Sequence, residues 1–129
     1  MILGAALITV ATACGGNDSQ LPQVERGNAI YASNCQSCHG DVATGDGGLP
    51  EAPVHGPSGH TWHHADGQLA DIVLGRFDYP GKTMPSFDGL LSEEEVSHVL
   101  AYFKTGWERD QVEFQEQVSK NWGAVQGGQ

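Results

Sequence analysis

The chain has 129 residues, of which 39% are apolar, and its mean hydropathy of -0.32 is typical of one soluble domain. Six basic residues are set against 16 acidic residues, which gives a net charge of -10 with histidine neutral. This excess of negative charge repels phosphate groups and excludes a nucleic-acid-binding protein; it favours either basic partners or a solvated surface without a specific partner.

The first 13 residues have the composition of an export signal. They are almost all apolar or small and uncharged, and the run is too short to cross a membrane as a mature helix. Ala11-Thr12-Ala13 is similar to a signal-peptidase site, whereas Cys14 directly after it suits cleavage with lipid attached to that cysteine. We favour the lipoprotein: residues 1–13 are a signal peptide, and residues 14–21 are a lipidated Cys14 and a linker. The protein is then extracytoplasmic and held at a membrane by its lipid, with a soluble periplasmic form as the alternative.

The rest of the chain shows helical spacing of apolar residues and no strand-like alternation, so we predict an all-α fold. The signature of a capping box, Ser92 with Glu95 three residues later, predicts the start of the clearest helix. Gly106 ends or bends that helix. Asp66 can cap an earlier helix. Helices are expected over residues 23–34, from 65 or 66 to 74, and from 92 to about 104, with glycine- and proline-rich turns over 40–59 and 76–87.

The tail adds a further helix to this domain. Trp107, Phe114, Val118 and Trp122 are spaced 7, 4 and 4 residues apart, which predicts that they share one side of a helix. We expect this helix to lie back over the domain, and a docking face for another protein is the alternative. The expected organisation is a domain over residues 22–105 and a helical extension over residues 106–129.

One short motif carries the chemistry. Cys35-Gln36-Ser37-Cys38-His39 places two thiols one helical turn apart, where each can form a thioether with a vinyl group of one haem, and the adjacent imidazole can bind the iron. A zinc knuckle would need two more ligands at similar spacing, and a thioredoxin-like redox pair would need a βαβ setting. Neither context is present, so we predict covalent haem c.

The iron needs a sixth ligand or an open position, and this choice separates electron carriers from enzymes and gas-binding proteins. Met84 is the only methionine after residue 13 and lies 45 residues beyond His39, between Thr83 and Pro85. The prolines at 80 and 85 restrict the backbone and indicate an ordered loop, which is a poor setting for a methionine that only fills a core. We predict that the Met84 thioether binds the iron and raises its potential.

These features together resemble a class I monohaem cytochrome c. The resemblance rests on Gly27-x-x-x-Tyr31, on Cys35-x-x-Cys38-His39-Gly40, on Met84-Pro85 and on a helix with Leu100-Ala101-Tyr102-Phe103, and it covers about residues 24–104. It implies three to five helices around one haem, with the first and last helices of that domain crossing near Gly27 and Tyr102. It also implies His39 and Met84 as axial ligands, and a backbone carbonyl of Pro50 or Pro53 that holds the proximal imidazole.

The run His60-Thr61-Trp62-His63-His64 departs from that family. Its three histidines can bind copper or zinc, or compete with Met84 for the iron. We expect them instead to line the haem edge, where Trp62 or a histidine can hydrogen-bond a haem propionate. His55 and His98 have weaker claims to a site, and His98 is expected at the surface or rim.

The predicted function is electron transfer between redox proteins, without catalysis, because a saturated iron leaves no open coordination position. A terminal oxidase or a membrane reductase complex is the kind of partner considered, and nucleic acid is not. The alternatives are a haem protein with bis-His ligation or an open site, or a metal-handling lipoprotein that uses His60, His63 and His64.

Overall fold

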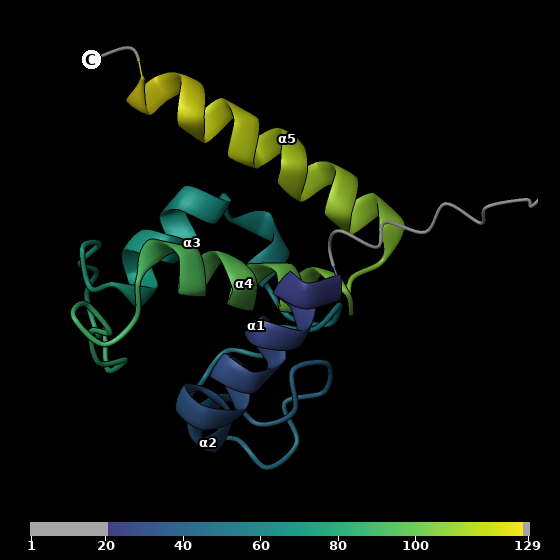
Figure 1. Ribbon diagram of the computed structural model, residues 1–129, viewed down its shortest axis with the longest axis vertical. Helices are drawn as coiled ribbons and strands as arrows, with labels where there is room; N and C mark the ends of the chain where they lie inside the picture. Colours follow the sequence, from purple (N-terminus) through teal and green to yellow (C-terminus); the bar gives the residue numbers. More distant parts are fainter. Residues whose placement is uncertain (1–20, 128–129) are drawn as a thin grey trace, which may run out of the picture.

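The computed structural model describes residues 21–127. The chain there is helical and contains no strand, apart from one isolated bridge between Asp88 and Leu91, so the predicted all-α fold is confirmed. The predicted signal peptide, Cys14 and nearly all of the linker lie outside the described residues. The elements are α1 (Leu21–Asn34), α2 (Gln36–His39), the short 3₁₀ helix η1 (Thr61–His63), α3 (Asp66–Val73), α4 (Glu93–Lys104) and α5 (Arg109–Gln126) (Figure 1).

Helices α1 and α4 cross in direct backbone contact, as the resemblance implied (Figure 1). Gly27 of α1 is buried there, and a β-carbon at this position would lie 1.9 Å from the backbone oxygen of His98 and 3.0 Å from Cβ of Tyr102. Only glycine therefore permits this approach. His98 is only 6% exposed, so its expected position at the surface or rim is wrong: the close crossing covers it.

Helix α4 begins where its sequence predicts. The Glu95 backbone N–H donates to Ser92 Oγ at 3.2 Å, and the Ser92 N–H donates to the Glu95 carboxylate at 2.8 Å. These two bonds close a capping box and satisfy N–H groups that have no partner within the helix. The buried face of α4 then presents Val96, Val99, Leu100 and Phe103 to the core, where they meet Tyr31 of α1.

Helix α3 begins differently from the prediction. Its cap is Ala65, which contributes no side-chain bond, and Asp66 is already the first helical residue. The Asp66 carboxylate instead accepts hydrogen bonds from Lys104 Nζ at 2.6 Å and from Gln115 Nε2 at 2.7 Å. Its negative charge still suits the positive end of the helix dipole, but its partners come from α4 and α5.

Helix α5 lies over η1 and α3, which confirms that the tail packs back onto the domain (Figure 1). The predicted buried side of this helix is wrong in detail. Trp107 precedes the helix, Phe114 is 48% exposed, and the fully buried residue is Gln115. No helix within residues 21–127 combines the length and the apolar composition that crossing a membrane requires.

Candidate haem site

A cavity of about 640 Å³ lies between α2, α3, α4 and the loop that joins α3 to α4. Most of its lining is apolar, including Leu69 from α3 and Leu100 from α4. The four residues predicted to hold the haem, Cys35, Cys38, His39 and Met84, all line it. Its volume lies within the range of roughly 300–1,000 Å³ that is usual for cofactor and ligand pockets.

The His39 imidazole is buried and oriented by the backbone. It is 8% exposed, and its Nδ1–H donates to the carbonyl oxygen of Pro53 at 2.9 Å. A carbonyl can only accept, so this bond requires the proton on Nδ1 and leaves the Nε2 lone pair free to bind a metal. Of the two proline carbonyls considered from the sequence, the structure places that of Pro53 against His39.

His55 forms a second layer behind His39. The two rings lie 4.4 Å apart, and His55 stacks on Phe103 at 4.3 Å with an interplanar angle of 13°. Its Nδ1 is 2.8 Å from Thr61 Oγ1. Burial, and secondarily the charge of His39, lowers the pKa of His55 to about 3. A neutral, fixed imidazole therefore packs against the His39 ring at ordinary pH, in a role that the weak sequence signal at His55 did not predict.

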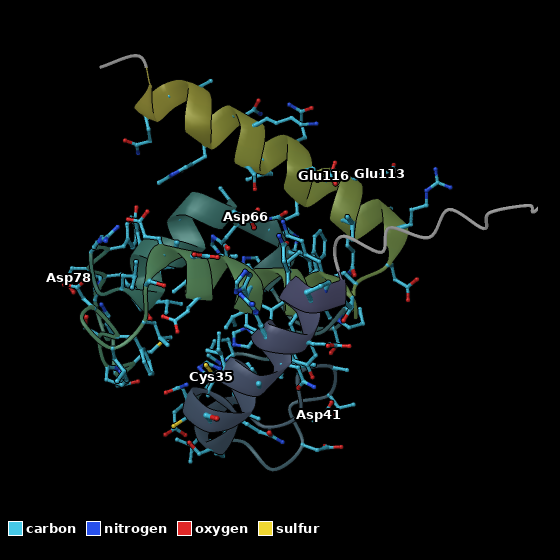
Figure 2. All side chains as sticks on the ribbon, viewed as in Figure 1. Cys35, Asp41, Asp66, Asp78, Glu113 and Glu116 are labelled. Atoms are coloured by element: carbon cyan, nitrogen blue, oxygen red, sulfur yellow. The ribbon has the colours of Figure 1, made fainter. Side chains whose placement is uncertain are left out.

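Cys35 and Cys38 lie at the junction of α1 and α2, and Figure 2 marks Cys35 there. The Cys38 N–H donates to the Cys35 carbonyl at 3.0 Å, and the His39 N–H donates to the same oxygen at 2.9 Å. This single helical turn brings both side chains to one cavity. Both cysteines are free, and burial, aided by the charge of Cys38, raises the pKa of the Cys35 thiol to about 11.

Met84 lies on the other part of the lining, in the loop between α3 and α4. Its side chain is half-buried and packs against the buried core. Phe77 and Tyr79 of the same loop also line the cavity, yet they are 36% and 39% exposed. With Leu49, which is 47% exposed, they form an apolar rim. The sequence analysis did not single out these three residues, although aromatic residues in a turn-rich loop were a usable signal.

The histidines of the run stay close together, with the His60 ring 4.2 Å from the His63 ring and 5.2 Å from the His64 ring, but only two of the three line the cavity. His60 and His64 line the cavity, while His63 stacks on Trp62 at 3.6 Å outside it. Trp62 does not line the cavity, and its buried Nε1–H has no hydrogen-bond partner among the described residues. Within residues 21–127, no group of three or more His, Cys, Asp or Glu side chains is arranged to hold a metal ion.

The lining fits a haem. It offers an apolar enclosure, one imidazole with a free Nε2, one thioether and two thiols on a single turn. These are the donor types that hold haem c and fill both axial positions of its iron. Cys14, predicted to carry lipid, lies outside the described residues.

Comparison with known protein families found a match. The family model described as cytochrome C oxidase, cbb3-type, subunit III matches residues 22–103, which is more than half of the chain. The chain belongs to this family. It is a c-type cytochrome, its cofactor is covalently bound haem c, and its general activity is electron transfer. No curated protein and no solved structure matched the cytochrome. The family match ends at Phe103, so α5 lies beyond it.

Proposed function

We propose that the cytochrome is a single-electron carrier in which Cys35 and Cys38 attach the haem, while His39 and Met84 bind its iron. The observation that carries this proposal is the cavity itself: all four side chains line it, and the Pro53 carbonyl leaves only Nε2 of His39 available to a metal. The Cys14 lipid anchor and the extracytoplasmic location belong to the same proposal, because thioether attachment and an export signal point to the same compartment.

Each part of the lining has a chemical role. The haem supplies a one-electron iron couple when bound. The apolar side chains of α3 and α4 exclude water and stabilise the state with the lower net charge. The Pro53 carbonyl makes the His39 imidazole a stronger donor, and the soft Met84 sulfur favours ferrous iron. A filled sixth position leaves no site for substrate or gas, so the proposed carrier is not an enzyme.

The exposed rim gives the electron a route to a partner. Leu49, Phe77 and Tyr79 line the cavity and also reach solvent, so a partner docked on them approaches the cofactor without any opening of the fold. Small interfaces suit rapid exchange between redox proteins. The family description names an oxidase, and a terminal oxidase or a membrane reductase complex is the class of partner that we propose.

The second candidate is bis-His ligation, because His60 and His64 also line the cavity. Optical spectra of the purified holoprotein in both oxidation states separate the two candidates. We expect the far-red methionine-to-ferric-iron band in the wild type, its loss in Met84→Ala, and carbon monoxide binding by the reduced variant alone. His60→Ala and His64→Ala are the matched controls and should keep the band. A wild-type spectrum without the band, or one changed by a histidine variant, would contradict ligation by Met84.

A separate experiment tests the anchor. Full-length Cys14→Ala should lose incorporated radiolabelled palmitate and leave the membrane fraction, while Cys35 and Cys38 still hold the haem. Label that persists in Cys14→Ala would show that this residue is not lipidated.

A further inference from the structure

Three side chains of the tail donate hydrogen bonds to one segment of the cavity wall. Trp107 Nε1 donates to the His55 carbonyl at 2.7 Å, Gln111 Nε2 to the Pro57 carbonyl at 2.9 Å, and Gln115 Nε2 to the His64 carbonyl at 3.1 Å. The donors are spaced every four residues, so they follow one line along the start of α5 and the turn before it. Their acceptors are all backbone carbonyls of residues 55–64.

This contact is buried and specific. Trp107 is 7% exposed and Gln115 is fully buried. Gln115 Nε2 donates to Asp66 Oδ1 at 2.7 Å as well as to His64, so both protons of the amide nitrogen are used. If the amide were flipped, its oxygen would lie against two acceptors, so only one orientation of the side chain is favourable. Asp66 also accepts a hydrogen bond from Lys104 Nζ. It lies on the side of the domain that faces α5 (Figure 2).

The segment that accepts these bonds, residues 55–64, follows the residue that orients the predicted proximal ligand. Pro53, whose carbonyl accepts the His39 Nδ1–H, lies two residues before His55, and the His55 and Thr61 side chains line the cavity. Pro53 and the first part of this segment belong to the loop over residues 40–59, which has no regular secondary structure, so its position depends on such contacts. A buried carbonyl that lost its donor would cost free energy until the loop moved to recover a partner.

We propose that residues 107–115 are a positioning element for the haem, which holds the Pro53 carbonyl against His39 and thereby sets the reduction potential. This inference rests on the proposed role of His39 as an iron ligand. A firm Nδ1–H bond makes the imidazole more basic and stabilises ferric iron. Release of residues 55–57 would let Pro53 move away from His39 and weaken that bond, so the potential should rise.

The test uses the full-length holoprotein and two kinds of variant. Trp107→Phe keeps most of the ring and removes the N–H, and Gln111→Glu keeps the acceptor that caps α5 at Glu108 but cannot donate to Pro57. Trp122→Phe is the matched control: this residue packs on Gly67 of α3 and donates to none of the three carbonyls. Each is measured by potentiometric titration and by exchange of the His39 Nδ1–H with solvent, followed by NMR.

We expect Trp107→Phe and Gln111→Glu to raise the potential and accelerate exchange of the His39 proton by tenfold or more, and Trp122→Phe to change neither. An unchanged potential in both Trp107→Phe and Gln111→Glu, or an equal rise in Trp122→Phe, overturns the proposal. If Trp107→Phe does not fold, Gln111→Glu alone decides, because its side chain is only half-buried. A wild type without a His39 ligand signature would instead contradict the proposed function, so the two failures are distinguishable.

Discussion

The cavity has two unlike walls. On the wall that carries His39, the imidazole is 8% exposed, bonded to Pro53 and backed by the His55 ring. The wall that carries Met84 belongs to a loop in which every residue from 75 to 81 is exposed. Residues 78–85 of this loop make only one backbone–backbone hydrogen bond, from Lys82 N–H to the Tyr79 carbonyl.

This difference separates the tasks of the two proposed ligands. The His39 wall is preorganised, so we expect the proposed ligand there to keep one orientation in both oxidation states and the Met84 wall to adjust to the iron. Local opening is cheapest where buried contacts and backbone hydrogen bonds are fewest. We therefore expect ligand exchange to begin on the Met84 side.

The largest expected effect concerns the proposed haem attachment next to His39. The double variant Cys35→Ala, Cys38→Ala should lose covalent haem completely, because no other described cysteine lies in the cavity. Met84→Ala should retain its haem. Haem staining after denaturing electrophoresis, with intact mass, measures both. Covalent haem in the double variant would contradict the assigned attachment.

Both walls depend on the α1–α4 crossing, and its loss should weaken them together. A methyl group in Gly27→Ala would meet backbone, and we expect a loss of about 3 kcal/mol in the free energy of unfolding. Gly123→Ala in α5 has nothing within 4 Å and should instead gain up to about 1 kcal/mol. Urea unfolding followed by circular dichroism measures both. Equal effects of the two substitutions would mean that the crossing tolerates expansion.

The burial of His55 behind His39 predicts that the free energy of unfolding depends on pH. His55 has a pKa of about 3 when folded and an ordinary value of 6.5 when unfolded, so the unfolded chain binds the extra proton below pH 6.5. His55 therefore leaves the free energy of unfolding unchanged above pH 6.5 and lowers it by up to about 1.4 kcal/mol for each pH unit below that value. His55→Leu should flatten the fall in unfolding free energy between pH 6.5 and 4.5. An unaltered slope would show that His55 is not buried as a neutral ring.

The smallest expected effect compares two glycines with the same backbone. Gly47, in the loop after His39, and Gly81, in the Met84 loop, have φ of 83° and 81°, and a β-carbon at either would meet nothing within 4 Å. Alanine should cost about 1 kcal/mol at Gly47, where the loop is held, and less at Gly81, where it can relax. Equal losses in urea unfolding would argue that the two walls are equally stiff.

The features that could be predicted from the sequence depend on neighbouring residues. The capping box of Ser92 and Glu95 and the turn from Cys35 to His39 each act over a few positions, and the structure contains both. The close approach at Gly27 joins residues far apart in the chain, and it was expected because the family resemblance implied it. The roles of Asp66 and Gln115 could not be predicted in this way, because their partners lie 38 to 51 residues away in the chain. The choice between Pro50 and Pro53 likewise depends on the path of a loop without regular structure.

The compactness of the Cys35–His39 turn has a consequence for how the protein is assembled. Five consecutive residues carry both proposed thioether positions and one proposed axial ligand, so a haem can be attached to a chain that has not yet folded. Met84 lies 45 residues beyond His39, and closing a loop of that length costs about 3 kcal/mol of chain entropy. Once the haem is attached, the proposed binding of Met84 to its iron is an intramolecular step that can offset the cost of closure, and the cofactor then acts as a template for the last part of folding. The fixed wall is then the starting point of assembly, and the adjustable wall is completed last.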